Sequence, residues 1–207
     1  MTRNIIFDWS GVVKDALDCH LWIVNEIFKE FKVKEISGKE LQENWEQPHM
    51  IFYNKYLPNL TEAEESALYK KLILGSDCPK SKPVAEMCEL IKELKERKYF
   101  LGVISTDLPE TIFAEIEEYG LKDIFDNVVT CSAVKGVSLR EMMGRYNLNP
   151  EDTYFIGDSN HEIIAGKENK TKTVAVTWGF NTEEYLKIKD PDYLAHNVRE
   201  LKNILFK

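Results

Sequence analysis

The chain of 207 residues is 43% hydrophobic and 30% charged, which is typical of a globular protein with a sizeable core and argues against disorder or a coiled coil. Acidic residues outnumber Lys and Arg by 35 to 27, so the net charge of −8 disfavours a general nucleic-acid surface or an anionic-membrane surface, but not a small phosphorylated ligand. The four scattered cysteines lack metal-ligand or disulfide spacing, and the apolar stretch near the N-terminus is too short for a signal peptide. No apolar run approaches the roughly 20 residues of a membrane span. We therefore expect a cytoplasmic protein without membrane contact.

The first predicted element is a strand over 4–8 that is apolar on both faces, as is typical of a buried strand in a parallel sheet. Helical patterns follow without a convincing strand. We expect helices over 16–31, from residue 37, over 49–56 and over 61–74. Two of them begin with capping-box patterns, Ser37 with Glu40 and Thr61 with Glu64. This part of the chain is therefore predicted to be all-helical.

Residues 76–83 are dense in turn residues and predict a hinge, after which helices and strands alternate. We expect helices over 84–98, 110–119, 138–147, 161–169 and 198–206, and strands over 99–104, 126–130, 153–157 and 173–177. Asp107 with Glu110 forms a cap-like start for the second of these helices. Such alternation predicts βα units and a parallel sheet with helices on both faces.

The predicted fold class is therefore α/β, with a Rossmann-like parallel sheet flanked by helices. We expect a discontinuous core formed by residues 1–14 and 80–207, and an all-helical insertion over 15–79.

Polar residues stand at or just past the ends of four predicted strands: Asp8, Ser105, Thr130 and Asp158. Open parallel sheets bind ligands at the carboxyl ends of their strands, so these side chains are expected to converge on one edge. Two carboxylates at one edge repel each other unless a cation lies between them, and hard oxygen ligands favour Mg²⁺. Lys135, after the third core strand, adds a positive charge. Together these groups are typical of a site that binds a phosphoryl group.

These residues resemble a known family. Three stretches and one lysine are similar in order and spacing to the four motifs of the haloacid dehalogenase superfamily of hydrolases. In chain order they are Phe7-Asp8-x-x-Gly11-Val12, Val103-Ile104-Ser105-Thr106, Lys135 and Phe155-Ile156-Gly157-Asp158-Ser159-x-x-Glu162. The resemblance covers essentially the whole chain. It implies that the helical insertion over 15–79 is the small mobile cap of one branch of that superfamily, a branch whose last core strand resembles residues 174–179.

The resemblance also implies a role for each residue at the nucleophile and the metal. Asp8 would be the nucleophile and would form an aspartyl-phosphate. Mg²⁺ would be held by Asp8, Asp158 and the backbone carbonyl of Ser10. Glu162 stands where the family usually has an aspartate, as a direct or water-mediated partner of the metal.

The remaining motif residues are implied to hold the phosphoryl group. Ser105 would donate a hydrogen bond to it, and Lys135 would pair with both it and Asp8. Thr106 stands where many members have asparagine. The resemblance therefore favours a Mg²⁺-dependent phosphatase, acting as a monomer or homodimer on a small phosphorylated metabolite.

Ser10 departs from the phosphatase pattern, which usually has a second aspartate two residues after the nucleophile. That aspartate protonates the leaving group and then activates water, and a serine hydroxyl titrates too high to do so at neutral pH. Three alternatives stay open. In the first, another group such as His49 replaces the acid. In the second, the protein cleaves a C–P bond, as phosphonoacetaldehyde hydrolases do with a cap lysine, for which Lys55 is the best candidate here. In the third, the protein binds a phosphorylated metabolite without turnover.

Overall fold

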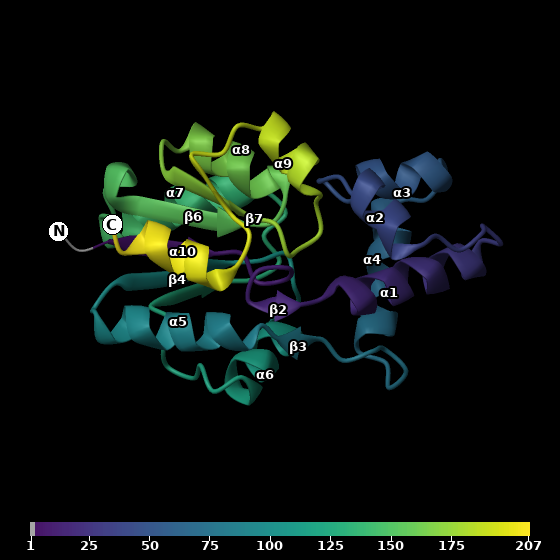
Figure 1. The fold of residues 1–207 in the computed structure, drawn as a ribbon. Helices are drawn as coiled ribbons and strands as arrows, with labels where there is room; N and C mark the ends of the chain where they lie inside the picture. Colours follow the sequence, from purple (N-terminus) through teal and green to yellow (C-terminus); the bar gives the residue numbers. More distant parts are fainter. Residues whose placement is uncertain (1–2) are drawn as a thin grey trace.

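The computed structural model describes residues 3–207 and is built around one six-stranded sheet in which all strands are parallel (Figure 1). Its strands, in spatial order, are β5 (Asn127–Val129), β4 (Phe100–Ile104), β1 (Asn4–Phe7), β6 (Thr153–Gly157), β7 (Lys172–Val176) and β8 (Tyr193–Ala195). The central strand β1 pairs with β4 and β6, so that Phe7 is level with Val103 and Ile156. The residues just after these three strands therefore meet at one edge.

Helices cover both faces of the sheet, because the side chains of its central strands are buried on both sides. Ile5 and Phe7 belong to the core formed with α5 (Ala85–Glu96), α6 (Pro109–Glu118) and α10 (Val198–Leu205). Ile6 belongs to the opposite core, which contains α7 (Lys135–Tyr146) and α8 (Asn160–Glu168). The predicted Rossmann-like α/β fold is confirmed.

The predicted all-helical segment contains four helices, α1 (Leu17–Glu30), α2 (Gly38–Asn44), α3 (Met50–Tyr56) and α4 (Glu62–Ile73). They surround a hydrophobic core of their own, to which Phe28, Leu41 and Phe52 contribute fully buried side chains. The predicted capping box of Thr61 and Glu64 is present at the start of α4. Figure 1 shows these helices standing to one side of the sheet, past the ends of its strands.

Short elements were missed or misplaced by the sequence analysis. The predicted hinge contains β3 (Lys82–Pro83), which pairs antiparallel with β2 (Lys14–Asp15) and so joins the two connections between the sheet and helices α1–α4. Helix α9 (Glu183–Ile188) and strand β8 were also missed, since elements of six and three residues are too short for a clear periodicity. Helix α7 begins at Lys135 rather than at residue 138.

Within residues 3–207, no helix is both long enough and apolar enough to cross a membrane.

Candidate active site

A cavity of about 150 Å³ lies between the carboxyl edge of the sheet and helices α1–α4. Asp8 and Asp158 line it from the ends of β1 and β6, as the strand-end argument predicted, and Lys135 lines it from the first residue of α7. The volume is below the roughly 300–1,000 Å³ of pockets for drug-sized ligands. The cavity in this form therefore suits a small ligand.

Lys135 holds two of the carboxylates at the floor of the cavity. Its Nζ lies 2.7 Å from Asp8 Oδ1 and 2.6 Å from Glu162 Oε1, and all three side chains are buried. Burial raises the pKa of Asp8 to about 7, against the opposing effect of Lys135. Burial, with Asp8 and Glu162 nearby, also raises the pKa of Asp158. Fully ionised, Asp8, Asp158 and Glu162 would therefore carry more negative charge than Lys135 balances.

The three carboxylates fit a divalent cation. Asp8, Asp158 and Glu162 each offer an oxygen within 4.8 Å of the others. Asp158 Oδ2 accepts a hydrogen bond from the Phe180 N–H (2.6 Å), and within residues 3–207 no donor pairs with its Oδ1. A hard cation held by such oxygens would remove the repulsion that the metal-free cluster carries.

Glu162 is anchored by protein groups on both oxygens. Its Oε1 accepts from Lys135, and its Oε2 accepts from the Ser159 hydroxyl (2.7 Å) and the Ser159 N–H (3.0 Å), which completes a capping box at the start of α8. The longer side chain that stands in place of the family's aspartate is therefore fixed in position beside the cluster. Its proximity fits either a direct or a water-mediated contact with a metal.

Two glycines leave space for Asp158. Gly11 has φ +82°, and a Cβ added there would collide with Asp158 Oδ2, as would a Cβ at Gly179. Gly11 was part of the first sequence motif, whereas the role of Gly179 was missed, because its contact with Asp158 depends on how the loops after β6 and β7 pack. Both positions need glycine for close approach to a carboxylate.

We expect Gly11→Ala to displace Asp158 and to lower both metal affinity and stability, the latter by roughly 1–3 kcal/mol because alanine is strained at this φ. Isothermal calorimetry with Mg²⁺ and thermal denaturation would measure the two effects. Gly144→Ala is the matched control, because a Cβ there meets nothing within 4 Å and the residue lies inside α7. Equal Mg²⁺ affinity in both variants would contradict the predicted contact.

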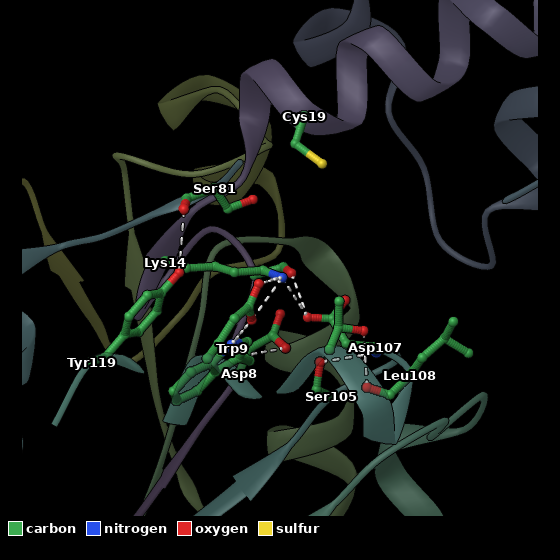
Figure 2. Close-up of polar contacts among 12 residues, drawn as sticks. Asp8, Trp9, Lys14, Cys19, Ser81, Ser105, Asp107, Leu108 and Tyr119 are labelled. Carbon is green, nitrogen blue, oxygen red and sulfur yellow. Dashed lines mark hydrogen bonds and ion pairs between the residues drawn. The ribbon is translucent and has the colours of Figure 1, made fainter. Parts of the chain in front are cut away.

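Ser10 takes part in a buried polar network that the sequence did not reveal. Its hydroxyl donates to Asp107 Oδ2 (2.8 Å), and Lys14 Nζ lies 3.1 Å from the same oxygen and 2.9 Å from Glu115 Oε1. Trp9 Nε1 donates to Glu115 Oε2 (2.7 Å). Figure 2 shows Lys14 extending toward Asp107. Asp107 lines the cavity, so a carboxylate does stand beside Ser10, supplied by the loop after β4.

The expected capping role of Asp107 was wrong. The residue before α6 is Leu108, which makes no side-chain cap, and Asp107 turns instead toward Ser10 and Lys14. Burial opposes the ionised form of Asp107, but Lys14 and the Ser10 hydroxyl outweigh it and lower the pKa of its carboxyl. A lysine directly after the apolar pair at 12–13 was the one sequence signal that a buried carboxylate partner was needed.

The predicted phosphoryl-binding residues lie in different places. Thr106 lines the cavity, whereas Ser105 is buried behind it, and its hydroxyl accepts from the Asp107 N–H (3.1 Å). Thr130, at the end of β5, is outside the cavity lining. Position at a strand end therefore brought Asp8 and Asp158 together but did not place every polar residue in the cavity.

Helices α1–α4 contribute the opposite wall of the cavity. His49 lines it, as a replacement acid would have to, but its Nε2 lies 3.1 Å from Glu65 Oε2. Lys55 lies outside the lining and pairs with Glu46 (2.8 Å). Among residues 3–207, Lys14 and Lys135 are the only lysines of the lining, and neither belongs to these helices. In the described part of the chain, helices α1–α4 therefore place no lysine in the cavity for the C–P alternative.

The sequence matches the family described as haloacid dehalogenase-like hydrolase over residues 5–176. It is 24% identical over 208 aligned residues to a pyrophosphatase, PpaX, of Halalkalibacterium halodurans, covering 98% of this chain and 96% of the relative. It is 33% identical over 122 residues to PpaX of Bacillus mycoides, a match that spans 56% of this chain and only 57% of that relative. A solved haloacid dehalogenase-like hydrolase from Streptococcus pneumoniae superposes with a TM-score of 0.85 at 21% identity, covering 100% of this chain and 99% of that one.

Proposed function

Because this chain belongs to the haloacid dehalogenase-like hydrolase family, we propose that it is a Mg²⁺-dependent phosphatase of a small phosphorylated metabolite. One observation carries the proposal: a buried aspartate, Asp8, is held by Lys135 beside two further carboxylates at the floor of a cavity. Such an arrangement provides a nucleophile together with a charge environment that suits a phosphoryl group and a divalent cation. The names of the relatives, which are pyrophosphatases, agree with phosphoryl chemistry.

In the first step a carboxylate oxygen of Asp8 attacks phosphorus, the P–O ester bond breaks, and an aspartyl-phosphate forms. The departing alkoxide takes a proton from water and leaves as the alcohol. Lys135 supports this step because its charge favours the ionised form of Asp8, whose pKa burial alone would raise further. Asp8, Asp158 and the Ser10 carbonyl, with Glu162 beside them, would hold Mg²⁺, and the bound ion would neutralise charge on the phosphoryl oxygens.

In the second step a water molecule attacks phosphorus, the bond to Asp8 breaks, and inorganic phosphate leaves. We assign the proton of this water to Asp107, which lines the cavity, accepts from Ser10, and stands near the place of the missing aspartate. Ser10 would then orient Asp107 instead of acting as the base. Residues 15–79 would serve as a cap that excludes other water while the reaction proceeds.

The test is product release from p-nitrophenyl phosphate and from glucose 6-phosphate, with Mg²⁺ and with EDTA, including early time points. We expect steady turnover of both esters with Mg²⁺ and none with EDTA, with the aryl ester faster because its leaving group needs no proton. A single burst followed by a stall would contradict the role of Asp107. Binding of both esters without any product would contradict the phosphatase proposal and favour a binding protein.

A further inference from the structure

The wall of the cavity formed by α1–α4 carries polar groups that the proposed phosphoryl chemistry does not use. Glu65 of α4 is only 4% exposed, and Tyr53 of α3 is fully buried. Within the described residues, Tyr53 Oη and His20 Nε2 are buried and have no hydrogen-bond partner. We call His20, Tyr53 and Glu65 the cap cluster; all three line the same cavity as Asp8. Unpaired buried polar atoms are costly, so a ligand that pairs with them would gain affinity.

The cap cluster offers acceptors more than positive charge. Burial lowers the pKa of His20 to about 4 and raises the pKa of Tyr53, so both side chains are neutral near pH 7. His49 Nε2 lies 3.1 Å from Glu65 Oε2, and this imidazole carries a charge only when it is protonated. Glu65 Oε1 makes no hydrogen bond within residues 3–207. A neutral imidazole, a phenol and this free carboxylate oxygen are suited to a group with several N–H donors.

Within residues 3–207, both lysines of the cavity lining are already paired with carboxylates. Lys135 is shared between Asp8 and Glu162, and Lys14 is shared between Asp107 and Glu115. No arginine lines the cavity in the part of the chain that the structure describes. A leaving group that carried a phosphate or a carboxylate would therefore face the carboxylate of Glu65, with only the His49 imidazole, which already lies against that carboxylate, as a counterion.

Aromatic rings enclose the same end of the cavity. The His20 ring lies 4.4 Å from Trp45 and 5.1 Å from Phe180, measured between ring centroids, and both aromatic residues line the cavity. Faces of aromatic rings attract cations, most strongly where water is excluded. The surroundings of the cap cluster thus favour a cation over an anion.

The chemistry at Ser10 points to the same kind of leaving group. With Ser10 in place of the usual acid and Asp107 held ionised by Lys14, this pair of side chains has no carboxyl proton to give to the departing oxygen. An ammonium group close to that oxygen would stabilise the negative charge that develops on it. A cationic alcohol therefore needs a general acid less than a neutral one does.

We infer that the cap cluster binds the ammonium group of a small amino-alcohol phosphate, whose three N–H donors would pair with Glu65, Tyr53 and His20 while the phosphoryl group lies at Asp8. This inference rests on the proposed phosphatase function. The proposed substrate class differs from the pyrophosphate that the relatives' names suggest. Pyrophosphate would bring a second anionic group to Glu65.

The experiment compares kcat/KM for phosphoethanolamine, for its neutral isostere n-propyl phosphate, and for phosphoglycolate. We expect the wild-type protein to prefer phosphoethanolamine over n-propyl phosphate by at least about tenfold, and over phosphoglycolate by at least about 100-fold, as hydrogen bonds to a charged group predict. Glu65→Gln should reduce the first ratio to near one. Glu43→Gln is the matched control, because it makes the same change at an exposed position of α2 and should keep the ratio.

The outcomes separate the inference from the function on which it rests. Equal or better use of n-propyl phosphate or phosphoglycolate by the wild-type protein would overturn the inference and leave the phosphatase proposal intact. If no ester is hydrolysed, p-nitrophenyl phosphate included, the phosphatase proposal fails. Calorimetric Kd values for the same three esters, with Mg²⁺ present, then decide the inference. The same order of affinity, lost in Glu65→Gln, would support it, and an equal or reversed order would overturn it.

Discussion

Replacing Asp8 with Asn lowers kcat by at least about 10⁴-fold on every phosphomonoester that the wild-type protein hydrolyses, if Asp8 is the nucleophile. The amide has nearly the same size as the carboxylate but is a very weak nucleophile. Its oxygen can still accept the hydrogen bond that the Trp9 N–H donates to Asp8 Oδ1 at 2.7 Å. Fold should be retained, because Lys135 keeps its partner Glu162 at 2.6 Å. Steady-state kinetics and far-UV circular dichroism would measure the two effects.

Asp15→Asn is the matched control for this variant, because it makes the same chemical change at an exposed residue of β2. Its kcat should equal that of the wild-type protein. A further readout is the phosphorylated enzyme itself, which acid quenching and mass spectrometry should detect in the wild type and in Asp15→Asn but not in Asp8→Asn. If Asp8→Asn kept a tenth of the wild-type activity, the aspartyl-phosphate mechanism would be wrong.

Most of the sheet could be predicted from the sequence, because strands β1, β4, β6 and β7 are buried on both faces and so consist of short apolar runs. The strand predicted over 153–157 has the same bounds in the structure, and β1 follows its apolar run with Ile5 and Phe7 on one face and Ile6 on the other. The pair β2 and β3 could not be predicted, because two-residue strands depend on contact between segments far apart in the chain. Tertiary contact, not local preference, decides such elements.

The floor of the site was predictable for the same reason that the sheet was. Residues that follow neighbouring parallel strands must meet, and Asp8 and Asp158 do. The cap cluster was not predictable, since its three members come from three different helices whose packing has no local signature. Asp107 was assigned the wrong role because an aspartate near a helix start is usually a cap, and only the position of Lys14 and Ser10 in space shows otherwise.

Asp107→Asn should separate the two steps of the proposed reaction. With p-nitrophenyl phosphate we expect the initial burst to remain, because the aryl group leaves without a proton, and the steady rate to fall by about 10²- to 10⁴-fold, the usual contribution of a general base. Rapid-quench measurement of the burst and of the steady rate in one experiment would test this. Loss of the burst together with the steady rate would mean that Asp107 acts on the first step, contrary to its assignment.

Glu115→Gln distinguishes a base from a residue that only holds the network together. Glu115 is the other carboxylate partner of Lys14, at 2.9 Å, but it does not line the cavity. Both Asp107→Asn and Glu115→Gln should lower the free energy of unfolding, because each breaks a buried ion pair of Lys14. The loss should be limited to about 3 kcal/mol, because Lys14 keeps its other carboxylate partner. The slow second step should appear in Asp107→Asn alone. If Glu115→Gln stalled after the burst in the same way, the carboxylate at Asp107 would act by positioning the loop at Ser10, and the proton of the attacking water would have to go to another group of the cavity.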